Sequence, residues 1–167
     1  HYDHDAVTMV IGNPTIIDTQ GVHTPADGLV ITGVPSKHDA QDGAKRGDNL
    51  IFVFEAEGLK IVHMGDIGHA VTERQRHAIG TPDVLLLPVG GAYTTDAASA
   101  AENVRLLCPR MAIPMHYRTA YDPELKIDTV QPFLELMKES PTPTPLLRLA
   151  KWDMSERPGV VLMEISD

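Results

Sequence analysis

Short aliphatic runs recur along the chain, and most are bounded by Gly, Pro or Asp. Runs rich in Val, Ile and Leu with such flanks are typical of buried β-strands. We expect strands at residues 15–18, 28–34, 50–55, 59–64, 84–89, 111–115 and 160–165. The dipeptide Glu57-Gly58 separates two of these runs and predicts a tight hairpin turn.

Helical periodicity appears in three segments, at residues 71–79, 96–107 and 128–140. In the second segment Thr95 or Asp96 is suited to the N-cap, and Pro109 stops the helix. In the third segment Pro132 falls in the first turn, where its missing N–H costs little. Helices alternate with strands in the middle of the chain, after an early hairpin. This order predicts the α/β class, with a mixed sheet covered by helices.

Length and charge narrow the class of protein. The chain has 167 residues, enough for one domain. Its formal net charge of −9 disfavours nucleic acid and anionic membrane surfaces as partners. No apolar run approaches the ~18 residues of a membrane span. The single cysteine, Cys108, excludes an internal disulfide and is compatible with a reducing cytoplasm, where we expect the protein to act.

Histidine and aspartate side chains gather at the ends of the aliphatic runs. The run that starts at residue 28 leads to His38, the run 59–64 leads to Asp66 and His69, and the run 111–115 leads to His116. The carboxyl ends of strands are where α/β sheets tend to place their sites. These donor types suit a divalent metal ion such as zinc.

The opening segment, His1-Tyr2-Asp3-His4-Asp5, adds two imidazoles and carboxylates. Taken alone, it fits either a metal-binding turn or a solvated terminus, such as the remnant of a polyhistidine tag. Together with the downstream strand ends, it favours metal binding.

These motifs resemble those of a known family. The segment His1-Tyr2-Asp3-His4 resembles the last four residues of the His-x-His-x-Asp-His signature of the metallo-β-lactamase superfamily. His38, Gly65-Asp66 and His116 resemble its remaining metal motifs, in the same order. The segments 33–38, 65–69, 87–93 and 113–117 resemble a branch of small metal-dependent hydrolases that includes the L-ascorbate-6-phosphate lactonases.

The resemblance implies an αβ/βα sandwich with two divalent metal ions at one edge, between two sheets. By motif, His1 and His38 would join an upstream histidine at the first metal, and Asp66 would bridge the two metals. Asp3, His4 and His116 would hold the second metal. The upstream histidine is not in the sequence, which begins inside that motif. We therefore expect residues 1–167 to form the C-terminal larger part of one metallo-β-lactamase-like domain, without its N-terminal strands.

The expected function is a metal-dependent hydrolase that attacks a small ester, lactone or phosphoester with metal-bound hydroxide. Zinc is the first choice of metal, and manganese or iron would also suit these ligands. Asp66, His69 and Tyr93 are the candidate catalytic residues, although His69 also fits a capping role at the surface. His63 alternates away from Asp66 and is expected to be structural.

Two other functions stay open. One is a phosphodiesterase or nuclease of the same superfamily. The other is a non-catalytic metal-binding domain, because the first metal site lacks one ligand. We expect a small-molecule substrate rather than a nucleic acid or membrane partner, and homo-oligomerisation is left open.

Overall fold

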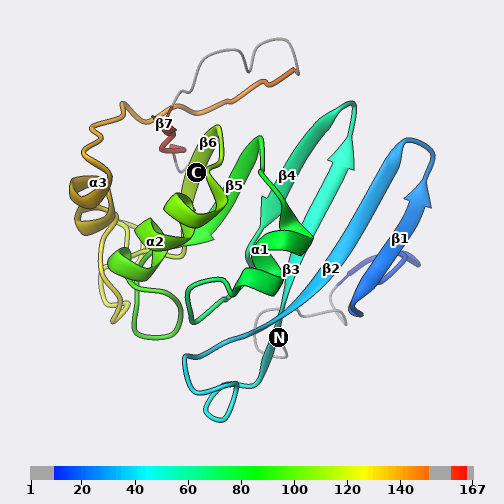
Figure 1. Ribbon diagram of the computed structural model, residues 1–167. Coiled ribbons are helices and arrows are strands. Elements are labelled where there is room, and N and C mark those ends of the chain that lie inside the picture. Colours follow the sequence, from blue (N-terminus) through cyan, green and yellow to red (C-terminus); the bar gives the residue numbers. More distant parts are fainter. Residues whose placement is uncertain (1–9, 151–158, 165–167) are drawn as a thin grey trace.

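The structure is a computed structural model, and it describes residues 10–150 and 159–164. The predicted ligands His1, Asp3 and His4 lie outside the described residues. The described strands form one seven-stranded sheet in the order β1 to β7 (Figure 1). Their bounds are Gly21–Ala26 (β1), Leu29–Lys37 (β2), Asp48–Ala56 (β3), Leu59–His63 (β4), Val84–Pro88 (β5), Met111–Met115 (β6) and Gly159–Val160 (β7).

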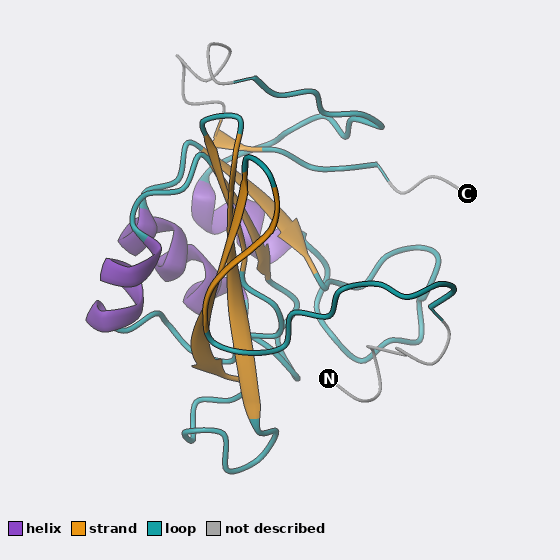
Figure 2. Ribbon diagram, turned by 90° about the vertical axis from the view of Figure 1, so that its right-hand side faces the viewer, coloured by secondary structure: helices purple, strands orange, loops and turns teal. Residues whose placement is uncertain are grey.

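Strand direction divides the sheet into two parts. Strands β1 to β4 pair antiparallel, whereas β4 to β7 pair parallel. Parallel neighbours need a crossover, and a helix supplies each one. These helices are α1 (Glu73–Ile79), α2 (Ala97–Leu107) and α3 (Gln131–Met137). Figure 2 shows all three on one face of the sheet, so the predicted mixed sheet and α/β class are confirmed.

Local signals fix the helix ends close to where the sequence places them. Thr72 and Gln75 form a reciprocal capping box at the start of α1. Asp96 caps α2 by accepting the Ser99 N–H, and Cys108 ends that helix in the left-handed region just before Pro109. Among the described residues, none of the helices is long and apolar enough to cross a bilayer.

The Glu57-Gly58 turn is confirmed as the hairpin between β3 and β4. Both residues have positive φ, at 52° and 75°. Two successive residues in this region form the turn whose twist matches that of the flanking strands.

The edge of the sheet differs from the prediction. Residues 15–18 are not a strand, and β1 at Gly21–Ala26 takes the edge position instead. The β1 sequence carries polar residues and Pro25, and nearly all of it is exposed. An edge strand needs no buried alternation, so hydrophobic periodicity does not detect it. The last strand is also shorter than predicted, because regular pairing covers only Gly159–Val160.

Two apolar clusters hold the sheet. The larger one joins the sheet to the helices and includes Ile51, Val62, Leu85, Leu87 and Phe133, all fully buried. The smaller one lies around Val84 and Met111 and receives Leu147 and Leu149 from the segment after α3. With both clusters packed, strands β2, β4 and β6 end at the same edge of the sheet, which is where the predicted site residues lie.

Candidate functional site

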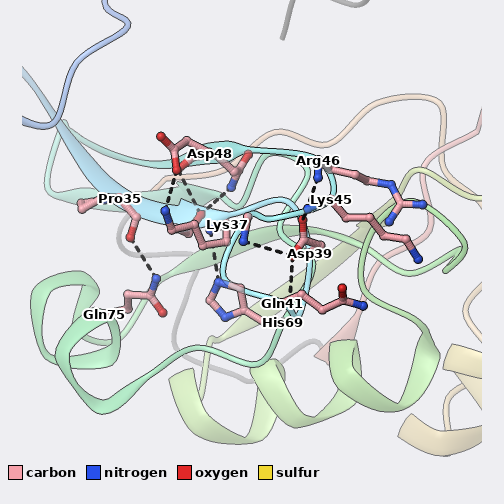
Figure 3. Close-up of polar contacts among 12 residues, drawn as sticks. Pro35, Lys37, Asp39, Gln41, Lys45, Arg46, Asp48, His69 and Gln75 are labelled. Carbon is pink, nitrogen blue, oxygen red and sulfur yellow. Dashed lines mark hydrogen bonds and ion pairs between the residues drawn. The ribbon is translucent and has the colours of Figure 1, made fainter.

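His38 follows β2 directly and is held by the backbone around it. Its N–H donates to the Gly47 carbonyl at 3.1 Å. The next residue, Asp39, accepts four backbone N–H groups from Gln41, Gly43, Lys45 and Arg46, at 2.7–3.0 Å (Figure 3). Burial raises the pKa of Asp39, but these four hydrogen bonds lower it by more, so the carboxylate form is favoured. The loop after β2 is thus organised around one buried carboxylate, and His38 lies at its base.

Asp66 meets His38 at the carboxyl end of β4. The His38 Nε2 atom lies 3.3 Å from the Asp66 Oδ2 atom. The His38 side chain is 5% exposed, whereas that of Asp66 is 22% exposed. The turn before Asp66 needs Gly65, because its φ is +58° and a Cβ atom there would collide with the Asn49 side chain. The structure therefore brings these two predicted ligands together.

His116 follows β6 in a conformation that non-glycine residues seldom adopt. Its φ is 51°, in the left-handed region. Its carbonyl accepts the Gly90 N–H at 3.1 Å, and a Cβ atom on Gly90 would collide with that carbonyl oxygen. The Nδ1 atom of His116 lies 3.4 Å from the Thr94 hydroxyl oxygen. A histidine held through Nδ1 presents Nε2 outward, which is the common arrangement of a metal-binding imidazole.

These three side chains line one pocket of about 650 Å³. The other lining residues are Ile17, Asp18, Asp48, Asn49, Leu50, Phe52, His63, Gly65 and Met115. The pocket lining combines apolar side chains with histidine and aspartate, as sites for small molecules commonly do. Asp18, Asp48 and Asp66 also make it favourable for cations.

The donor chemistry of this pocket fits a divalent metal ion. Imidazole and carboxylate suit zinc, manganese and iron. Within residues 10–150 and 159–164, however, no three His, Cys, Asp or Glu side chains converge closely enough to form a metal site by themselves. A complete site needs further donors. The predicted ones, His1, Asp3 and His4, lie outside the described residues.

His63 also lines the pocket, contrary to the expectation from strand alternation. Strand β4 ends at His63, and the turn through Gly65 brings Asp66 to the same pocket. The Nδ1 atom of His63 accepts the Gly65 N–H at 3.1 Å, so a hydrogen on the neutral ring resides on Nε2. Burial lowers the pKa of His63 below its ordinary value of 6.5, and the Asp66 charge opposes this shift only in part.

His69 lies outside the pocket lining, and backbone groups occupy both of its ring nitrogens. Nε2 accepts the Lys37 N–H at 3.2 Å (Figure 3). Nδ1 lies 2.8 Å from the Ala70 carbonyl oxygen. Since Nε2 accepts, the ring hydrogen is on Nδ1 and is donated to Ala70. In this arrangement His69 supports the backbone next to His38, and its catalytic role stays a prediction.

Tyr93 is 46% exposed and does not line the pocket either. The Arg46 guanidinium lies over its ring, 5.5 Å from the centroid, and also donates to the Ala92 carbonyl at 2.9 Å. Arg46 thereby connects the loop after β2 to the loop after β5. A contact between Tyr93 and substrate stays a prediction.

Comparison with known proteins gives relatives over most of the chain. A family model described as a beta-lactamase superfamily domain matches residues 1–116. A UPF0173 metal-dependent hydrolase from Thermococcus onnurineus is 37% identical over 130 residues, covering 72% of this chain and 58% of the relative. One from Thermofilum pendens is 36% identical over 154 residues, covering 92% of this chain and 60% of the relative. The chain thus spans about 60% of the length of these curated relatives.

A solved structure agrees with the sequence relatives. A protein from Thermotoga maritima, described as a candidate Zn-dependent hydrolase of the metallo-beta-lactamase superfamily, aligns with a TM-score of 0.77 and 38% identity. The alignment covers 98% of this chain and 78% of that one. With the family model, the sequence relatives and the fold in agreement, the chain belongs to the metallo-β-lactamase superfamily.

Proposed function

We propose that this protein is a metal-dependent hydrolase of a small ester, lactone or phosphoester. The observation that carries the proposal is that His38, Asp66 and His116 line one pocket at the carboxyl edge of the sheet, with His38 and Asp66 in contact. The names of the curated relatives, which are metal-dependent hydrolases, support it.

Each of the three side chains has a role in this proposal. His38 and His116 would each bind a metal ion through a ring nitrogen, and Asp66 would bridge two ions with its carboxylate. His1, Asp3 and His4 would supply the further ligands. Divalent metal ions, when bound, lower the pKa of water and polarise the substrate carbonyl or phosphoryl oxygen.

The pocket supports a small molecule as substrate. Its volume of about 650 Å³ lies within the usual range for small-molecule sites. Leu50 and Phe52 from β3 add apolar side chains to its lining. The net charge of −9 opposes a polyanion such as nucleic acid. Zinc is the metal we propose first. A lactone is the first substrate class to test, because of the motif resemblance to the lactonase branch. We also propose that the protein acts in the cytoplasm.

Metal stoichiometry and turnover test this function together. We expect about two Zn²⁺ per chain by elemental analysis, with hydrolysis of a simple lactone or of bis(p-nitrophenyl) phosphate. Asp66→Ala should lose both metals and the activity. His77→Ala, on the exposed side of α1, is the matched control and should keep both. A folded wild-type protein with one metal or none, and no turnover, would support the non-catalytic alternative instead.

A further inference from the structure

We propose that Asn49 is the positioning residue of the candidate metal centre, holding the Asp66 turn and the strand that leads to His38 in their relative places. Asn49 lies near the start of β3, between β2 and β4, at the edge where both of those strands end. The inference rests on the proposed metal site, but it concerns a residue that the metal motifs do not include.

The first set of contacts joins Asn49 to the turn that presents Asp66. The Asn49 Oδ1 atom accepts the Asp66 N–H at 2.9 Å. The Asn49 Nδ2 atom donates to the Met64 carbonyl at 3.0 Å. The amide therefore binds the backbone on both sides of Gly65. Because Gly65 has no side chain, nothing obstructs this close approach. Through these two bonds, Asn49 fixes the backbone from which the Asp66 carboxylate projects.

The second set of contacts joins Asn49 to β2. The Asn49 Nδ2 atom also donates to the Ser36 hydroxyl at 2.6 Å. The same hydroxyl lies 3.3 Å from the Asn49 carbonyl oxygen, to which it donates. Ser36 and Asn49 are register partners across the β2–β3 pair, and Ser36 is buried. Ser36 precedes His38 by two residues, so these hydrogen bonds connect Asn49 to the strand that leads to the other candidate ligand.

Only the asparagine amide can make all three of these side-chain hydrogen bonds. It supplies one acceptor for the Asp66 N–H and two donors for the Met64 carbonyl and the Ser36 hydroxyl. Aspartate would keep the acceptor but would place a carboxylate oxygen against the Met64 carbonyl. Alanine would leave the Asp66 N–H and the Met64 carbonyl without this partner.

The expected consequence is weaker metal binding. The His38 Nε2 atom and the Asp66 Oδ2 atom lie 3.3 Å apart, and metal ligation tolerates shifts of only a few tenths of an ångström. Residues that orient metal ligands typically change metal affinity by about 10- to 100-fold when they are replaced. We expect Asn49→Ala to weaken Zn²⁺ binding within that range.

The experiment compares four variants with the wild type. Asn49→Ala, Asn49→Asp, Ser36→Ala and Thr72→Ala are titrated with Zn²⁺ by calorimetry and with Co²⁺ by visible absorption, whose bands report ligand geometry. Each variant is also melted in the presence of a chelator. Thr72→Ala removes the N-cap of α1 and is the control for a purely structural loss.

Asn49→Ala should bind Zn²⁺ about 10- to 100-fold more weakly and alter the Co²⁺ spectrum. Asn49→Asp keeps the acceptor for the Asp66 N–H but lacks both donors, so it should also weaken Zn²⁺ binding and alter the Co²⁺ spectrum. Ser36→Ala keeps both bonds to the Asp66 turn but loses the side-chain link to β2, so it should weaken Zn²⁺ binding by less than Asn49→Ala does. Thr72→Ala should melt at a lower temperature with unchanged metal binding.

Three results would overturn the inference. One is an Asn49→Ala protein with the affinity and Co²⁺ spectrum of the wild type. Another is a loss in Thr72→Ala that matches the loss in Asn49→Ala at equal destabilisation. If Asn49→Ala does not fold, an Asn49→Asp protein that folds and has the affinity and Co²⁺ spectrum of the wild type also counts against it. Absence of metal binding in the wild type would instead refute the proposed function.

Discussion

Asn103 offers a direct test of how the loop after β4 is held. It lies on α2, and its side chain is fully buried. Its Oδ1 atom accepts the Val71 N–H at 2.7 Å, and its Nδ2 atom donates to the His69 carbonyl at 3.3 Å. One side chain from a helix therefore satisfies two backbone groups of the loop that follows Asp66. Asn103→Ala leaves the Val71 N–H and the His69 carbonyl without this partner and creates a small cavity.

The magnitude follows from those two groups. A buried backbone group that loses its partner costs about 1–3 kcal/mol, so two cost about 2–6 kcal/mol. Alanine recovers about 0.5 kcal/mol through its better helix propensity. We expect the free energy of unfolding to fall by about 2–5 kcal/mol. For a chain of this length, each kcal/mol lowers the melting temperature by about 2–4 °C.

Urea unfolding followed by circular dichroism measures this loss, and Arg105→Ala is the matched control. Arg105 lies on the same helix but is exposed, and its ion pair with Glu102 is at the surface. Removing it should change the free energy of unfolding by less than about 0.5 kcal/mol. If Asn103→Ala costs less than about 1 kcal/mol, or no more than the control, the two hydrogen bonds do not hold the loop as argued.

Two further predictions concern the loop that carries His38. Gly68→Ala should lower the free energy of unfolding by about 2–3 kcal/mol in urea titrations, because its Cβ atom would collide with the backbone of His38 and Asp39. Gly47→Ala meets open space and should lose only about 1 kcal/mol from its positive φ, so equal losses would contradict the packing argument. Asp39→Asn should destabilise the protein most at neutral pH, because its four backbone hydrogen bonds favour the carboxylate and hold the folded pKa below the ordinary 3.8. This stabilisation is complete above pH 3.8 and is lost as the pH falls through the folded pKa, so the difference between wild type and variant should shrink in urea titrations from pH 5 to pH 3. A difference that stays constant over that range would exclude the carboxylate as its source.

Local patterns predicted most of the sheet and all three helices. Strands β2 to β6 have aliphatic runs because they are packed in the sheet, and the run itself reports that burial. Capping residues such as Asp96 and the Glu57-Gly58 turn act within a few residues, so the sequence displays them directly. Strand β1 was not predicted, because an exposed edge strand carries no such aliphatic run.

The site was predictable only as a set of separate motifs. His38, Asp66 and His116 each follow an aliphatic run, and the strand directions bring those ends to one edge. His63 was missed because alternation assumes that the strand continues, whereas β4 ends at His63 and the positive φ of Gly65 turns the chain. The hydrogen bond that His69 Nε2 accepts comes from Lys37, which is distant in sequence, so no local pattern indicates it.

The sequence by itself determined the fold class, the family motifs and the order of the candidate ligands, because these depend on periodicity and on short-range residue chemistry. Only the tertiary structure decided which side chains share the pocket and which of them support the backbone. Asn49 shows the reason, because its side-chain hydrogen bonds join β2 to the turn after β4. Contacts between segments far apart in the chain exist only once the strands have paired.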